Sequence, residues 1–189
     1  MKQKEKVYAY VDGNNLNLGI KILGWKLDFK KFRVYLKEKY NVLVAYIFIG
    51  YVPTNQDLYS SLQKAGFVLI FKPTLPDKDG EVKGNIDVDL VLQVMIDYKD
   101  NNLDKALIVT SDGDFYSLVK YLYEQRRLLF VMSPYIKTCS ALLKKSAKEK
   151  IIFMDNLRGK LEYKKYKWKS TAWGRNPKRC FFLYILLLV

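Results

Sequence analysis

Short apolar runs alternate with segments of helical periodicity along most of this chain. The runs are rich in β-branched and aromatic residues, which predicts buried strands over residues 7–11, 42–49, 67–71, 106–109, 128–132 and 151–154. Between them, apolar residues at helical spacing predict helices over residues 14–23, 29–40, 56–64, 86–98, 114–124 and 135–148. Strands that alternate with helices are typical of βαβ units. The pattern therefore predicts an α/β fold whose mainly parallel sheet has helices on both faces.

Residues at the ends of the predicted helices support these helix boundaries. Asp28 is placed to cap the second helix, and Gly66 to end the third. Asn14 and Asn85 are the predicted caps of the first and fourth helices. Residues 73–84, rich in proline, glycine and aspartate, predict a loop long enough to carry function.

A change of composition near residue 157 divides the chain. Residues 1–157 are the predicted globular domain, and residues 158–189 are an extension. Up to residue 179 the extension interleaves lysine and arginine with tyrosine and tryptophan, which suits single-stranded nucleic acid; a solvated basic tail is the alternative. Its last ten residues are wholly apolar, about half of the roughly 20 that a membrane span needs. We therefore expect no membrane span, and three interpretations of this end stay open: a packed strand, a contact in a homo-oligomer, or a tail of uncertain origin.

The charge balance indicates a polyanionic partner. The chain has 33 lysines and arginines against 19 aspartates and glutamates, a formal net charge of +14. Such a surface attracts nucleic acid, although solvated lysines on an ordinary soluble protein are the plainer explanation. The charged start and short first apolar run indicate no secretory signal, and two distant cysteines indicate a reducing cytoplasm.

Several chemistries are excluded by what the sequence lacks. It has no histidine, which excludes histidine-based triads, histidine general bases and most catalytic zinc sites. It also lacks the glycine patterns of dinucleotide folds, P-loops and nucleophile elbows. Any hydrolysis would therefore use an activated water at a metal ion, or a carboxylate base.

Three acidic motifs carry the candidate chemistry. Asp12 directly follows the first apolar run, Asp87 and Asp89 begin the fourth helix, and Asp112 and Asp114 follow the run at residues 106–109. Because the carboxyl ends of parallel strands meet at one sheet edge, these carboxylates are expected to converge. Clustered carboxylates repel one another unless a cation lies between them, and oxygen ligands suit Mg²⁺ or Mn²⁺. The predicted metal ligands are Asp12, Asp87, Asp89 and Asp112.

Each acidic residue also has a structural explanation. Asp114 is either a catalytic carboxylate or the N-cap of its helix. Asp87 and Asp89 are also the acidic residues that a helix dipole favours in a first turn, and their spacing of two lets only one of them face the site. Four neighbouring polar residues are the predicted substrate contacts: Asn15, Lys83, Thr110 and Ser111.

The stretches DGNN at residues 12–15, KGNIDVDL at 83–90 and TSDGDF at 110–115 resemble the NYN domain. More narrowly, they resemble its LabA-like (DUF88) branch in the PIN-like nuclease superfamily, over roughly residues 6–155. The resemblance implies a three-layer α/β/α sandwich, an acidic Mg²⁺ or Mn²⁺ pocket and cleavage of RNA. By motif position, it implies pocket roles for Asp12, Asn15, Asp87 and Asp112, with Asp114 as a companion.

One position departs from the family pattern. The family helix often carries another aspartate six residues after the one that matches Asp87, and here that position is Gln93. An amide carries no charge, which lowers the expected metal affinity.

The sequence therefore predicts a Mg²⁺- or Mn²⁺-dependent endoribonuclease that hydrolyses phosphodiester bonds of RNA, with single-stranded RNA favoured. Its catalytic residues are Asp12, Asp87, Asp112 and Asp114. The first alternative is a non-catalytic module that binds nucleic acid or a regulatory partner on the same fold. The second is a toxin-like nuclease whose apolar C-terminus docks an antidote or a second copy.

Overall fold

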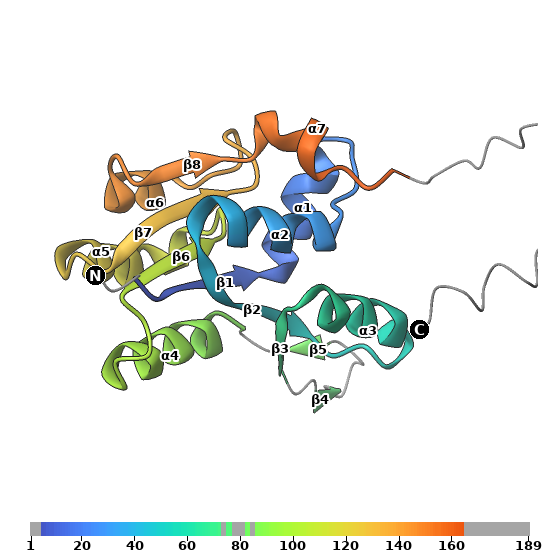
Figure 1. The fold of residues 1–189 in the computed structure, drawn as a ribbon, viewed down its shortest axis with the longest axis horizontal. Coiled ribbons are helices and arrows are strands. Elements are labelled where there is room, and N and C mark those ends of the chain that lie inside the picture. Colours follow the sequence, from blue (N-terminus) through green and yellow to red (C-terminus); the bar gives the residue numbers. More distant parts are fainter. Residues whose placement is uncertain (1–4, 73–74, 77–81, 84–85, 165–189) are drawn as a thin grey trace, which may run out of the picture.

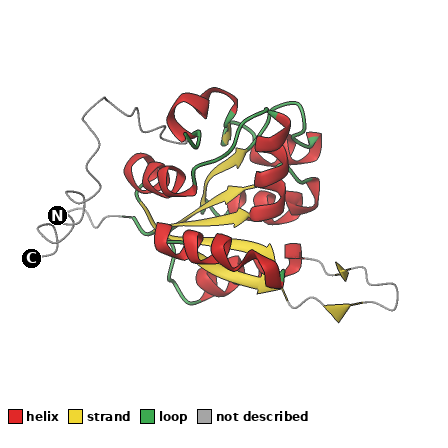
Figure 2. Ribbon diagram, turned by 90° about the vertical axis from the view of Figure 1, so that its right-hand side faces the viewer, coloured by secondary structure: helices red, strands yellow, loops and turns green. Residues whose placement is uncertain are grey.

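A computed structural model describes residues 5–72, 75–76, 82–83 and 86–164 (Figure 1). Its main sheet confirms all the predicted strands: β1 (Val7–Asp12), β2 (Val42–Gly50), β3 (Val68–Lys72), β6 (Lys105–Val109), β7 (Leu128–Ser133) and β8 (Ile151–Phe153). The strand order is β3-β2-β1-β6-β7-β8, and every neighbouring pair is parallel. A separate antiparallel pair, β4 (Leu75–Pro76) and β5 (Val82–Lys83), lies apart from this sheet (Figure 2).

Helices cover both faces of the sheet (Figure 2). One face carries α1 (Gly13–Ile22), α2 (Phe29–Tyr40), α3 (Gln56–Ala65) and α7 (Arg158–Leu161). The other carries α4 (Ile86–Lys99), α5 (Tyr116–Glu124) and α6 (Ala141–Ala147). Short 3₁₀ turns stand at η1 (Pro53–Asn55), η2 (Gly113–Phe115) and η3 (Asp155–Leu157).

The core is split between the two faces by the alternation of strand side chains. In β1, Val7, Ala9 and Val11 pack in the cluster under α1 and α2. Tyr10, which points the other way, packs in the cluster under α4 and α5. Successive strand residues face opposite sides, so this central strand is buried on both. The predicted three-layer α/β/α sandwich is confirmed.

The order of the strands creates a crevice at the sheet edge. From β1 the chain moves outward to β2 and β3, and then crosses back through α4 to β6 on the other side of β1. The segment after β1 therefore enters one helical layer, and the segment after β6 enters the other. In open α/β sheets, such a switch point at the carboxyl ends of two neighbouring strands is where ligands bind.

Two predicted helix ends are confirmed. The Asp28 carboxylate accepts a hydrogen bond from the Lys31 N–H at 3.1 Å and caps α2. Gly66 ends α3 in the left-handed conformation, with φ of 94°.

The predicted cap of the first helix is wrong. Helix α1 begins at Gly13, and the Asp12 carboxylate accepts from the Asn15 N–H at 3.0 Å, so Asp12 is the cap rather than Asn14. The reason is that β1 leads into α1 with no connecting residues. The last strand residue is therefore the one with extended backbone at the cap position.

The helix predicted over residues 135–148 is shorter in the structure. Helix α6 begins only at Ala141, because the preceding segment is held by contacts from other elements. The Ser140 N–H donates to the Ser111 carbonyl at 3.0 Å, and Pro134 packs against Gly19 of α1. These contacts fix the segment in a turn at the carboxyl edge of the sheet.

Other predictions fall partly outside the described residues. Most of the loop at residues 73–84, the Asn85 cap and residues 165–189 lie there. The domain limit at residue 157 stays a prediction; the described chain continues into α7, where Leu161 is buried and its carbonyl accepts from the Asp28 N–H at 2.8 Å. Over the described ranges, no helix combines the length and the apolar character needed to cross a bilayer.

Candidate metal centre

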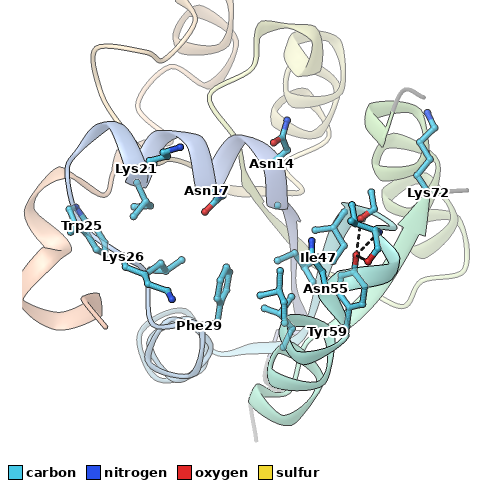
Figure 3. A pocket seen from close by; sticks show the side chains of 18 residues that line it. Asn14, Asn17, Lys21, Trp25, Lys26, Phe29, Ile47, Asn55, Tyr59 and Lys72 are labelled. Atoms are coloured by element: carbon cyan, nitrogen blue, oxygen red, sulfur yellow. Dashed lines mark hydrogen bonds between the residues drawn. The ribbon is translucent and has the colours of Figure 1, made fainter. Parts of the chain in front are cut away.

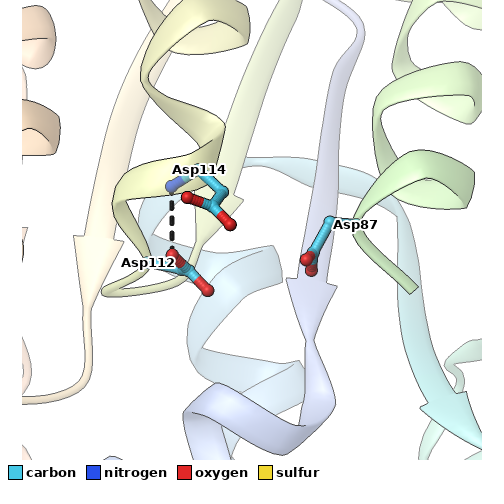
Figure 4. A group of neighbouring side chains, drawn as sticks. All are labelled: Asp87, Asp112 and Asp114. Atoms are coloured by element: carbon cyan, nitrogen blue, oxygen red, sulfur yellow. Dashed lines mark hydrogen bonds between the residues drawn. The ribbon is translucent and has the colours of Figure 1, made fainter. Parts of the chain in front are cut away.

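Three carboxylates converge at the switch point. Asp87 lies in the first turn of α4, and Asp112 and Asp114 lie where the chain leaves β6 and enters η2. One oxygen from each lies within 4.8 Å of the other two, and the three side chains point toward one another (Figure 4). Asp87 and Asp112 are half-buried, whereas Asp114 is exposed. The site is therefore open on one side to a ligand from solvent.

Asp12 lies at the end of β1, beneath this cluster. Its side chain is only 6% exposed, and it accepts hydrogen bonds from the Asn15 N–H at 3.0 Å and from the Thr110 hydroxyl at 3.2 Å. Burial raises the pKa of the Asp12 carboxyl, and the charge of Asp112 adds to the rise. The hydrogen bonds act in the opposite direction without cancelling it.

The electrostatics of Asp87 link it to all the other site carboxylates. Burial is the largest cause that raises its pKa, followed by the negative charges of Asp12, Asp112 and Asp114. Lys72 partly opposes the rise. The site therefore holds mutually repelling carboxylates, and a divalent cation would relieve that repulsion.

The donor set fits Mg²⁺ or Mn²⁺. The converging groups are all carboxylates, the hard oxygen ligands that these ions take, and the exposed Asp114 leaves the group open to solvent. Asp87, Asp112 and Asp114 are the residues placed to hold such an ion.

A group of hydrogen bonds, here called the latch, connects the carboxyl ends of β1 and β6. The Thr110 hydroxyl donates to Asp12 Oδ2 and accepts from the Asp112 N–H at 3.1 Å. Asn15 Oδ1 accepts from the Ser111 N–H at 2.7 Å. The latch joins the end of β1 and the start of α1 to the loop after β6, which sets the position of Asp112.

Asp112 also shapes its own loop. Its Oδ1 accepts from the Asp114 N–H at 3.0 Å, so Asp112 is the N-cap of η2. The alternative in which Asp114 is the helix cap is therefore wrong. Asp114, free of that role, turns its carboxylate toward Asp87 (Figure 4).

The predicted substrate contacts lie in or near the site. Thr110 is fully buried, and the Ser111 hydroxyl is bonded to the Ser133 hydroxyl at 2.9 Å, so both hydroxyls bind the protein itself. Asn15 is half-buried, with its carbonyl oxygen in the latch. Lys83 is in β5, and its side chain lies outside the described residues. Substrate contact by these residues stays a prediction.

Asp89 does not belong to the group of three. It lies on α4, half-buried, two residues after Asp87. Residues at this spacing point to nearly opposite sides of a helix. Its role as a metal ligand also stays a prediction.

Sequence reasoning missed a buried carboxylate near the far end of α4. Asp97 of α4 is 3% exposed and accepts from the Tyr10 hydroxyl at 2.9 Å and from the Gln93 amide at 3.2 Å. Gln93 is thus bonded to Asp97. Its burial could have been predicted from helical periodicity. Asp97 follows Leu90 and Val94 at helical spacing, and both of those residues are buried on α4.

Comparison with known proteins places the chain in a family. The NYN domain model matches residues 6–155. Among solved structures, a protein of unknown function from Vibrio parahaemolyticus aligns with a TM-score of 0.68 and 24% identity, covering 82% of this chain and 96% of that one. At this identity, the likeness establishes the fold. No curated protein matches the chain. Since the family model spans well over half of its length, this protein belongs to the NYN domain family.

Proposed function

We propose that this protein is an endoribonuclease of the LabA-like branch that hydrolyses RNA with Mg²⁺ or Mn²⁺. The observation that carries the proposal is the convergence of Asp87, Asp112 and Asp114 within 4.8 Å, at the switch point of a NYN domain. The buried free thiol of Cys139 supports a reducing, cytoplasmic setting.

Each carboxylate takes a distinct role in this proposal. Asp87 and Asp112 bind the ion, and Asp12 adds negative charge from beneath while it holds the latch. When bound, the ion supplies an activated water and positive charge beside the scissile phosphate. The exposed Asp114, the third residue placed to hold the ion, would bind it or take the proton of the attacking water. The Asn15 amide and Lys83 orient the phosphate.

A basic groove beside the site supports RNA as the polyanion. The groove lies between α5 and α6, has a volume of about 670 Å³, and carries the cations Lys120, Arg126, Lys145, Lys148 and Lys150. Tyr116, two residues after Asp114, lines it together with Tyr123 and one acidic residue, Glu124, which pairs with Lys120 at 4.0 Å. Cations between tyrosines suit a single strand, because the cations pair with phosphates and the rings stack on bases.

A non-catalytic binding module is the second candidate. The observation that favours it is Gln93, whose amide is bonded to Asp97 where the family often has a further carboxylate. Fewer charges lower the affinity for a metal ion, whereas the basic groove would still bind nucleic acid.

Cleavage of labelled single-stranded RNA tests the proposal. We expect cleavage with Mg²⁺ or Mn²⁺, none in EDTA, and a loss of about 100-fold or more in Asp112→Asn, since the charge that the site provides is then reduced. Asp100→Asn, an exposed carboxylate just after α4, is the matched control and should cleave normally. If the wild type binds RNA without cleaving it, the proposed nuclease activity is contradicted and the non-catalytic binding module is supported.

A further inference from the structure

A second cavity lies on the α1 face of the sheet, directly beside the acidic site. It has a volume of about 660 Å³ and is enclosed by α1, the start of α2, and the β2–α3 segment (Figure 3). Gly13 and Asn14, the two residues that follow Asp12, are among its lining residues. Lys72 lines it as well, and the charge of Lys72 reaches Asp87. The cavity therefore adjoins the segment that follows Asp12, on the side of the sheet that carries α1.

The floor of the cavity is apolar and aromatic. Trp25 and Ile47 are buried there, and the half-buried Phe29 ring points from the start of α2 toward α1 (Figure 3). The Phe29 ring is braced from behind by Phe67, edge to face, with centroids 6.2 Å apart. This bracing holds an aromatic surface in a fixed orientation toward the cavity.

The rim of the cavity is polar and carries only positive charge. Its amides are Asn14, Asn17 and Asn55, and the first two lie on the exposed face of α1. Its cations are Lys21, Lys26 and Lys72. Among the described residues that line the cavity, none is acidic. The cavity therefore selects for a ligand with an apolar body, hydrogen-bonding edges and negative charge.

A nucleotide has these three properties. A nucleobase has a flat face that stacks on aromatic rings and edges that both donate and accept hydrogen bonds, and each base carries a phosphate with it. Asparagine amides match such edges because they too donate and accept. The volume lies in the range of about 300–1,000 Å³ that is usual for small-molecule sites.

We propose that this cavity, here called the base cavity, binds an unpaired nucleobase of the RNA strand next to the phosphodiester at the acidic cluster. The inference rests on the proposed function for the identity of the strand. Phe29 stacks on the base, Asn17 contacts its edge from α1 (Figure 3), and the rim lysines pair with the adjoining phosphates. A base held in a double helix cannot enter, so the base cavity makes an unpaired nucleotide beside the cut a requirement.

Binding measurements with abasic RNA test the base cavity independently of cleavage. In the Asp112→Asn background, a labelled single-stranded RNA is replaced by a set in which each nucleotide in turn lacks its base, and affinity is read by fluorescence anisotropy. We expect one position, or two adjacent ones, to lose about tenfold in affinity, and the others little. In the wild type, the sensitive position should lie next to the cut.

A variant that fills the base cavity supplies the structural control. Asn17→Trp places a bulky ring in the cavity from α1, whereas Leu18→Trp places the same ring at an exposed neighbour that does not line it. We expect Asn17→Trp to lose about tenfold in affinity and to become insensitive to the abasic position, with Leu18→Trp unchanged. If Asn17→Trp fails to fold by circular dichroism, the pair Lys21→Glu and Lys26→Glu replaces it, with Lys64→Glu on α3 as the control.

The outcomes separate the base cavity from the nuclease. The base cavity is contradicted if the abasic scan shows no sensitive position and the cavity variants bind RNA normally. If the wild type still cleaves RNA with metal in that case, the proposed nuclease function holds without the base cavity. A sensitive position that disappears in the cavity variants supports the base cavity, even if the wild type cleaves no RNA.

Discussion

At the scale of single residues, the carboxylates of the acidic site repel one another. Protonation or a bound metal ion would reduce this repulsion. Burial raises the pKa of both Asp12 and Asp87, and neighbouring carboxylates raise it further. The net rise at Asp87 means that these effects outweigh the favourable position at a helix N-terminus. Such a group binds its proton more tightly in the folded chain. The free energy of unfolding therefore falls as pH rises from the ordinary aspartate value of 3.8 through the raised folded value.

This repulsion predicts that Asp87→Asn stabilises the metal-free protein. At pH 7 in EDTA, we expect its thermal midpoint to rise by a few degrees, since about 1 kcal/mol corresponds to roughly 2–4 °C in a domain of this size. At about pH 2.5, well below the ordinary aspartate value of 3.8, the difference should disappear, because the carboxyl is then protonated in both states. Added Mn²⁺ should raise the midpoint of the wild type and have little effect on the variant. Equal midpoints and equal metal responses at pH 7 would contradict both the repulsion and the ion site; Asp100→Asn is the control.

At the scale of elements, the position of the site depends on the direct passage from β1 into α1. Gly13 makes this passage possible because it lies against the β2 backbone. A Cβ atom there would lie 2.9 Å from the Phe48 carbonyl oxygen and closer still to the Ile49 side chain. The close approach places Asp12 at once at the end of a strand and at the cap of a helix.

Gly13→Ala is therefore expected to destabilise the fold by about 1–3 kcal/mol, the usual cost of overpacking. RNA cleavage should fall as well, since Asp12 and the Thr110 latch shift with α1. Urea denaturation gives the change in free energy of unfolding. The control is Gly159→Ala in α7, where an added Cβ meets nothing within 4 Å. A Gly13→Ala protein as stable as this control would contradict the close packing.

At the scale of the whole molecule, positive and negative side chains gather in different regions. The chain carries a net charge of +14, and yet Asp87, Asp112 and Asp114 converge at the switch point, with the basic groove and the base cavity on either side. Cations on both sides draw in a polyanion that the carboxylates alone would repel. In the proposed function, the metal ion makes the acidic centre compatible with a phosphate.

Salt dependence measures the contribution of the basic groove. For single strands, the slope of log affinity against log salt is about −0.7 for each phosphate contact, so Lys120→Ala and Lys145→Ala should each reduce its size by about 0.7. Lys64→Ala, an exposed lysine on α3 outside both cavities, should leave the slope unchanged. Identical slopes for all three variants would place the RNA elsewhere on the surface. The Asp112→Asn background avoids cleavage during the titrations.

Local patterns in the sequence were enough to predict the strands, most helices and the layered fold. Apolar runs and helical spacing are set by which side chains must be buried, and this information is carried by neighbouring residues. The same holds for Asp28 and Gly66, because a helix cap needs only a side chain or backbone conformation a few residues away. The motif positions likewise pointed to Asp87, Asp112 and Asp114 before their convergence was visible.

The tertiary structure decided what depends on partners distant in the sequence. The latch of Thr110 with Asp12, the burial of Asp97 against Tyr10 and the short α6 all arise from contacts between segments that only the strand order brings together. The base cavity is of the same kind, because its aromatic floor and its amide rim come from different elements. Periodicity tells which residues are buried, but which groups meet is set by the order in which the strands pack.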